Sequence, residues 1–230
     1  MNYFAHGRDY VDRPYFLAGT AVPDWLSVVD RRMRTRRRDV AKYTSDPDPH
    51  VSDIACGILQ HLRDDRWFHQ SRAFAELSLQ LTQRVREILS EDSGFRPSFL
   101  GHILVEILLD ATLIEQQPER LDEYYATFDT VDPHVVAQSV NRMATRQSDL
   151  LAAFIPRFLA ERFLYDYLDD EKLLWRLNHV MRRVNLTRLP NHFLEIFPEA
   201  RHKIRLRRNE LLAGEPGPAV DSDPTGGTPP

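Results

Sequence analysis

An apolar segment of the chain contains three ionisable side chains in a regular pattern. Residues 99–114 read FLGHILVEILLDATLI, and His102, Glu106 and Asp110 follow one another at intervals of four residues. Four residues turn an α-helix by about 400°, so each side chain is offset by about 40° from the previous one. The three therefore share one stripe of an otherwise apolar helix. Because an unpartnered buried imidazole or carboxylate costs several kcal/mol, the pattern predicts that something neutralises them.

A second segment has the same periodicity. Residues 57–69 read GILQHLRDDRWFH and place His61, Asp65 and His69 at positions i, i+4 and i+8. Imidazole and carboxylate groups bind Zn, Mn, Fe and similar ions, and two of them one helical turn apart, about 6 Å, can chelate one ion. We therefore predict that this helix and the 99–114 helix face each other across a divalent-metal site.

The first two members of each stripe form the chelating pairs. The last members, His69 and Asp110, lie about 12 Å along the helix axis from the first. A complete set therefore predicts two ions, or a role for His69 and Asp110 in proton transfer to a leaving group. Such a cluster would generate a hydroxide nucleophile and hold an anionic oxygen.

Two other interpretations of these stripes stay open. Histidine and carboxylate residues four positions apart also occur as pairs on solvated helix faces, which is the simpler interpretation of residues 61–69. For residues 98–115 the alternative is an internal hydrogen-bond or ion-pair network, with Arg96 or Arg142 as the partner.

The rest of the chain predicts helices that could position these side chains. Residues 71–89 place apolar side chains at steps of three and four among strong helix formers, and no convincing alternating strand pattern occurs. We predict an all-α fold of about eight helices, including segments 71–89, 98–115, 134–147, 149–168, 170–184 and 191–212. Residues 18–24, AGTAVPD, predict a turn, and residues 44–50, TSDPDPH, predict a surface loop.

Composition limits the class of protein. The 230 residues are 42% hydrophobic and carry a net charge of -4, which does not favour a chain-wide nucleic-acid binder. Residues 214–230 are rich in Pro and Gly and predict a disordered tail after a single domain at 1–213. The single cysteine, Cys56, excludes a disulfide framework and any CxxC zinc site.

No export signal or membrane span is visible in the sequence. The N-terminal residues MNYFAHGRDYVDR carry charges where a secretory signal needs an apolar run. No stretch reaches the roughly 18 uninterrupted apolar residues that a membrane-spanning helix needs. We therefore expect a cytoplasmic protein that does not enter the membrane.

The first half of the chain resembles the acyl carrier protein phosphodiesterases, helical members of the HD-domain superfamily. The opening MNYFAH is similar to their MNFLAH, and AGTAVPD is similar to their small-residue segment ending in a metal-binding aspartate. GILQHLRDD at 57–65 matches their Gly-Ile-x-x-His-x-x-x-Asp stretch, and His102 falls where they place a histidine on the next inward helix. The similarity covers about residues 1–115.

This resemblance implies a single HD-domain-like bundle with a manganese ion, for which Zn, Fe and Mg are alternatives. The implied ligands or near neighbours of the ion are His6, Asp24, His61, Asp65 and His102. The family hydrolyses the phosphodiester that joins 4′-phosphopantetheine to a serine of an acidic carrier protein. The chain departs from the family where His69 replaces an aspartate, and it contains no adjacent His-Asp dipeptide.

Zinc-dependent phospholipase C and the related single-strand nucleases offer a second, weaker resemblance. These helical enzymes use a His-x3-Asp followed by a His-x3-Glu to hold zinc, an order that His61/Asp65 and His102/Glu106 repeat. Both resemblances imply metal-assisted hydrolysis of a phosphoester.

Six arginines fall within residues 31–38, RRMRTRRR. On a helix they would form a positive surface, and we predict that Arg34, Arg37 and Arg38 bind an anionic substrate or partner. The alternative is a solvated charge run balanced by Asp30 and Asp39.

These observations together predict a divalent-metal-dependent hydrolase of phosphoesters, in which Asp65 and His69 carry the chemistry. Asp24, His61 and His102 hold the metal with Asp65, and His6 and Glu106 support or extend the site. Asp110 binds a second ion or transfers a proton, as His69 does. The alternative is a non-catalytic helical adaptor whose polar stripes are internal ion-pair networks. The sequence does not indicate an oligomeric state.

Overall fold

Helices form the whole framework of the residues that the computed structural model describes, which are 1–89 and 94–214. Within these residues there is no strand, and Thr35 and Ala144 form an isolated bridge. The predicted all-α fold is therefore confirmed. The predicted tail lies outside the described residues except for Gly214.

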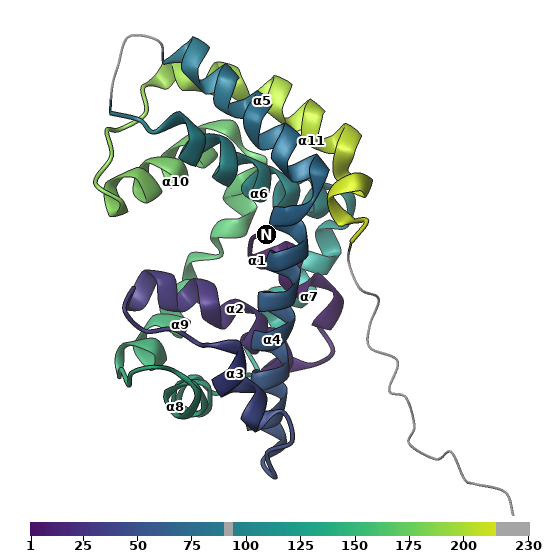
Figure 1. The fold of residues 1–230 in the computed structure, drawn as a ribbon, viewed down its shortest axis with the longest axis vertical. Helices are drawn as coiled ribbons and strands as arrows, with labels where there is room; N and C mark the ends of the chain where they lie inside the picture. Colours follow the sequence, from purple (N-terminus) through teal and green to yellow (C-terminus); the bar gives the residue numbers. More distant parts are fainter. Residues whose placement is uncertain (90–93, 215–230) are drawn as a thin grey trace, which may run out of the picture.

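Eleven α-helices occur in the described part of the chain (Figure 1). They are α1 Tyr3–Gly7, α2 Pro14–Val29, α3 Arg37–Val40, α4 Pro49–Gln70, α5 Arg72–Ile88, α6 Pro97–Gln116, α7 Pro118–Phe128, α8 Pro133–Met143, α9 Leu150–Glu161, α10 Asp170–Arg183 and α11 Phe197–Leu212. Short 3₁₀ segments join several of them, including Phe163–Leu168 between α9 and α10.

Local sequence explains where these helices begin. Proline stands in the first turn of α2, α4, α6, α7, α8 and α11, where its missing N–H has no helical partner to lose. Asp48, Ser71, Asp132 and Asp169 each accept a hydrogen bond from a backbone N–H of the helix that follows. These signals agree with the predicted helix starts near residues 71, 98, 134 and 170.

The predicted helical segments 149–168 and 191–212 are α-helical over only part of their length. The segment 149–168 leaves the α-helix after Glu161, because Arg162 adopts a left-handed backbone with φ of 40°. The segment 191–212 begins as a 3₁₀ turn and becomes α-helical only from Phe197. In both places the apolar side chains still reach the core, so periodicity alone could not locate the break.

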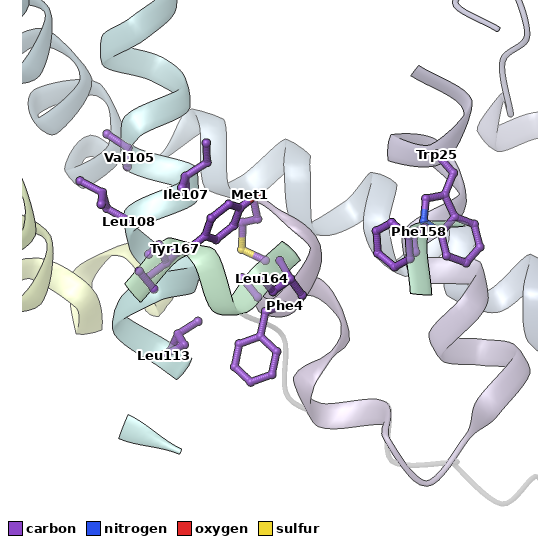
Figure 2. Close-up of a cluster of buried hydrophobic side chains, with 14 of the residues drawn as sticks. Met1, Phe4, Trp25, Val105, Ile107, Leu108, Leu113, Phe158, Leu164 and Tyr167 are labelled. Carbon is purple, nitrogen blue, oxygen red and sulfur yellow. The ribbon is translucent and has the colours of Figure 1, made fainter. Parts of the chain in front are cut away.

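Helix α6 lies at the centre of the bundle. It packs against α1, α5, α7 and α11, and its buried side chains include Leu104, Val105, Leu108 and Leu109. Figure 2 shows Val105, Ile107 and Leu108 of α6 in the same core as Met1 and Phe4 from the N-terminal segment. By length and composition α6 could also cross a membrane, but most of it is buried within the protein.

The predicted turn at residues 18–24 is wrong, because α2 continues through this segment to Val29. Its small residues serve helix packing instead. A Cβ on Gly19 would lie 2.4 Å from the carbonyl oxygen of Ile54 in α4, and a Cβ on Gly57 would lie 2.1 Å from that of Phe16 in α2. The helix backbones therefore meet directly at these two glycines, and Pro23 is accommodated inside α2.

We expect Gly57→Ala to destabilise the protein, because the added methyl group meets backbone rather than a flexible side chain. Overpacking of this kind costs about 1–3 kcal/mol, which urea unfolding followed by circular dichroism would measure. Ala75→Ser, which adds one atom at an exposed position of α5, is the control and should cost less than about 0.7 kcal/mol. Equal stability of the two variants would contradict close backbone packing.

Candidate metal centre

Two groups of potential metal ligands lie on facing helices. His6 of α1 joins His61 and Asp65 of α4, and His69 of α4 joins His102 and Glu106 of α6. In each group the ligand atoms lie within 4.8 Å of one another. The structure thus brings together six of the residues that the sequence predicted, in two groups that could each hold a metal ion.

In the first group, both imidazoles direct Nε2 towards one carboxylate. His6 Nε2 lies 3.3 Å from Asp65 Oδ1, and His61 Nε2 lies 3.4 Å from Asp65 Oδ2. The two rings are stacked with their centroids 3.9 Å apart. Both histidines are buried, whereas the Asp65 side chain is 34% exposed. The carboxylate therefore forms the open side of the group.

The opposite nitrogen of each ring has its own partner. His61 Nδ1 lies 2.8 Å from the carbonyl oxygen of Thr20 in α2, and His6 Nδ1 lies 3.3 Å from Asp64 Oδ2. Gln60 holds Asp64 in turn, with Nε2 donating to Oδ1 at 2.7 Å. Metal-binding histidines are oriented in this way, by a carbonyl or carboxylate at the nitrogen that does not face the metal.

The Thr20 contact determines which nitrogen of His61 carries hydrogen. A carbonyl oxygen only accepts hydrogen bonds, so Nδ1 is the donor, and in a neutral ring Nε2 presents a lone pair. That lone pair faces a carboxylate oxygen of Asp65, and two acceptors repel unless a cation or a proton lies between them. His6 Nε2 and Asp24 Oδ2 are also buried without a hydrogen-bond partner. These atoms fit a divalent cation.

The second group is arranged around Glu106. His69 Nε2 lies 2.8 Å from Glu106 Oε1, and His102 Nε2 lies 3.4 Å from the same oxygen. The two imidazoles are stacked with centroids 5.0 Å apart, and Phe74 of α5 packs edge-on against both. All three potential ligands are partly exposed, so this group is more open to solvent than the first.

The two groups adjoin each other. The amino group of Met1 lies 2.9 Å from Asp65 Oδ1 and 3.4 Å from Glu106 Oε1. Burial opposes ionisation of Asp65, but the adjacent His6 and His61 imidazoles and the Met1 amino group hold its pKa well below the usual range. Burial likewise opposes ionisation of Glu106, and the Met1 amino group, His102 and His69 lower its pKa. Both carboxyls are therefore anions that attract a cation.

Asp24 of α2 lies near the first group without belonging to it. Burial raises the pKa of this carboxyl to about 6, an effect that the nearby His61 opposes and Asp65 reinforces. Its Oδ2 atom is the buried oxygen without a hydrogen-bond partner. Asp24 is therefore available as a further ligand from the side of α2.

Asp110 is not brought into either group. Its Oδ2 and Oδ1 atoms accept hydrogen bonds from the backbone N–H groups of Phe4 and Ala5, at 2.9 and 2.8 Å. These are first-turn donors of α1, which have no partner within the helix. Asp110 therefore holds α1, and with it His6, in position. It was predicted to be a metal ligand, but its two oxygens are used by these backbone N–H groups.

A cleft of about 810 Å³ adjoins the site and reaches Glu106 of the second group. Asp24 and Glu106 line it, and its walls come from α2, α6, α9, α10 and the 3₁₀ segment Phe163–Leu168. In Figure 1, α10 lies in the upper half of the view and α2 and α9 lie below it. The cleft also contains Arg157 of α9 and Arg182 and Arg183 of α10.

The arginines predicted to bind substrate do not line this cleft. Most of the 31–38 run is not helical: Thr35 forms its bridge with Ala144, and only the one-turn helix α3 follows, containing Arg37 and Arg38. The cleft arginines were not predicted from the sequence, although Arg182 and Arg183 lie at the end of the predicted 170–184 helix. Nothing in its spacing indicated that α10 would face the metal ligands.

Comparison with protein-family models, curated proteins and solved structures finds no match for this chain. The geometry of the described residues is therefore what supports a functional interpretation.

We expect the contribution of the Asp110 carboxyl to the free energy of unfolding to decrease as pH rises. Burial raises the pKa of this carboxyl from 3.8 to about 7, against the opposing effects of the Phe4 and Ala5 amides. Between these two values the folded protein binds the proton and the unfolded chain releases it, so the free energy of unfolding falls as pH rises through that window. The decrease should be on the order of a few kcal/mol and should end above about pH 7.

Urea unfolding of the wild type and Asp110→Asn across this window measures the effect as a difference between the two proteins. Asp129→Asn, at an exposed position after α7, is the control and should give a flat difference. If the difference in unfolding free energy between the wild type and Asp110→Asn also does not change with pH, the Asp110 carboxyl ionises in the folded protein as it does in the unfolded chain.

Proposed function

We propose that this protein is a divalent-metal-dependent phosphohydrolase or phosphodiesterase. The observation that carries the proposal is the geometry of His61. Thr20 fixes its Nδ1 hydrogen, and its Nε2 faces Asp65 beside the buried, unpartnered atoms of His6 and Asp24. This is an arrangement of ligand atoms that a divalent cation would complete.

The adjoining second group favours a site for two ions. Two metal ions about 3.5–4 Å apart are typical of phosphatases and nucleases. Asp65 and Glu106 are both within hydrogen-bond distance of one amino group. If these residues hold divalent ions, the ions would supply activation of water and stabilisation of the charge that develops on phosphoryl oxygens.

The protein's own residues would position the substrate and move protons. Asp24 of α2 and Glu106 of α6 both line the cleft, so a phosphoester bound between them would lie beside the second group and beside the carboxyl nearest the first. His69 is partly exposed and its Nε2 contacts Glu106, which would keep the imidazole oriented for donating a proton to the leaving oxygen. The catalytic roles predicted for Asp65 and His69 are part of this proposal.

The substrate and metal follow from the resemblance to acyl carrier protein phosphodiesterases. By that resemblance the ion is manganese, with Zn, Fe or Mg as alternatives, and the substrate is a 4′-phosphopantetheinyl carrier protein or a similar phosphoester. The basic cleft is compatible with an anionic substrate of this kind. A cytoplasmic location belongs to the same proposal.

The alternative function is a non-catalytic helical adaptor. The observation that favours it is the contact of the Met1 amino group with both Asp65 and Glu106, since a protein cation can balance buried carboxylates without a metal. Metal binding therefore separates the two functions.

Elemental analysis of protein purified without added metal should find up to two ions per chain. His61→Ala and His102→Ala should each lower this content by removing a ligand from a different group, whereas His202→Ala, at an exposed position of α11, should not change it. Fewer than about 0.1 ion per chain, with no rise in unfolding temperature on adding Mn²⁺ or Zn²⁺, would reject the metal site.

The metal-loaded protein should hydrolyse bis(p-nitrophenyl) phosphate, followed by release of nitrophenol. Asp65→Asn should lower the rate by at least about 100-fold, because the open carboxylate of the first group is lost. Asp53→Asn is the matched control on α4, since this half-exposed carboxyl pairs only with Arg13 in the described structure, and it should keep the rate. Metal binding without hydrolysis would indicate a structural metal protein.

A further inference from the structure

The guanidinium groups of three cleft arginines have no partner within the described residues. The guanidinium groups of Arg157, Arg182 and Arg183 make no ion pair or hydrogen bond there, and all three residues are exposed. Arg176, in the same cleft, is different: it pairs with Asp166 at 2.7 Å and with Glu161 at 2.9 Å. The cleft therefore contains three positive charges that the protein itself does not balance.

These arginines come from two helices and converge on one cleft. Arg157 belongs to α9, and Arg182 and Arg183 belong to the last turn of α10. Apolar side chains line the cleft as well, among them Ile103 of α6 and Phe154 of α9. Guanidinium groups with free donors are suited to phosphate, which they can bind through paired hydrogen bonds.

The arginines share their cleft with Asp24 and Glu106 of the candidate site. Tyr3, another lining residue, has its pKa raised well above the ordinary value by burial and by Asp24, whereas Arg183 lowers it. The Asp24 carboxylate and the Arg183 guanidinium therefore both act on one phenol. Asp24, Glu106 and the three arginines line one cleft of about 810 Å³, so a ligand that fills it meets both ends.

Charge balance indicates what this ligand carries. Two divalent ions and the Met1 amino group would oppose the three carboxylates of Asp24, Asp65 and Glu106, leaving two positive charges, of which a phosphodiester neutralises one. The three arginines would then still lack an anion. A phosphodiester alone leaves the arginine side of the cleft unmatched.

We propose that the cleft takes a substrate with two phosphate groups. The scissile phosphoester lies at Asp24, Asp65 and Glu106, a second phosphate is bound by Arg157, Arg182 and Arg183, and the uncharged part between them contacts the apolar wall. The scissile end of this proposal rests on the proposed function, whereas the arginine subsite does not.

Alkanediol bisphosphates test the proposal, because they place two phosphates at the ends of an uncharged chain. Isothermal titration calorimetry would measure the dissociation constants of butanediol, hexanediol and octanediol bisphosphates and of the corresponding alkyl monophosphates. The wild type would be measured with Mn²⁺ and again in EDTA. With Mn²⁺, we expect at least one bisphosphate to bind at least about 10-fold more tightly than its monophosphate.

The double variant Arg182→Gln/Arg183→Gln should abolish this advantage and leave the affinity for monophosphates with Mn²⁺ within about twofold. Arg86→Gln is the control, since Arg86 is an exposed arginine of α5 outside the cleft, and it should keep the advantage. Circular dichroism would check that each variant is folded.

The outcomes in EDTA separate this proposal from the proposed function. In EDTA no metal ion is available to bind alkyl monophosphates. If the wild type binds them there and the double variant does not, the arginine subsite is supported even if the protein binds no metal. Equal dissociation constants for bisphosphates and monophosphates with Mn²⁺ would overturn the proposal that the substrate carries a second phosphate. The same conclusion follows if the double variant weakens the binding of both ligands by the same factor. If the wild type and the double variant bind alkyl monophosphates equally well in EDTA, the arginines do not form a phosphate subsite, and this part of the proposal is overturned.

Discussion

The close approach of α2 to α4 at Gly19 and Gly57 is the constraint on which the candidate site depends. With only hydrogen as the side chain at these positions, the two backbones meet and the Thr20 carbonyl reaches Nδ1 of His61. That hydrogen bond fixes the ring and directs Nε2 at Asp65. Asp24 follows Thr20 by about one turn, so the same contact carries its carboxyl towards the first group.

Asp110 has a comparable part in placing α1. A one-turn helix has too few internal hydrogen bonds to be stable alone, and the Asp110 carboxylate accepts the two N–H groups that begin it. His6 is thereby held over His61. The stripe of α6 thus changes role along its length: His102 and Glu106 belong to the open second group, whereas Asp110 is fully buried and holds the N-terminal segment.

Particular elements show how far the sequence could predict this arrangement. The periodicity of residues 71–89 and the cap at Ser71 predicted α5, since both are local properties of the chain. The AGTAVPD segment was interpreted as a turn because small residues and proline favour turns, yet here the small residues allow helices to touch. The arginines at 31–38 were predicted to bind substrate because they are concentrated in the chain, but Arg157 and Arg183, far apart in sequence, share the cleft.

The sequence by itself determined the helical class, most helix starts and the i, i+4 pairs of His61 with Asp65 and His102 with Glu106. These follow from backbone geometry, which repeats every few residues and needs no knowledge of neighbours. Only the tertiary structure decided that His69 joins the second group, that Asp110 caps α1 and that α10 supplies the cleft with arginines. Each of these contacts depends on which helices pack together and how closely. That packing is determined by many side chains that lie far apart in the sequence.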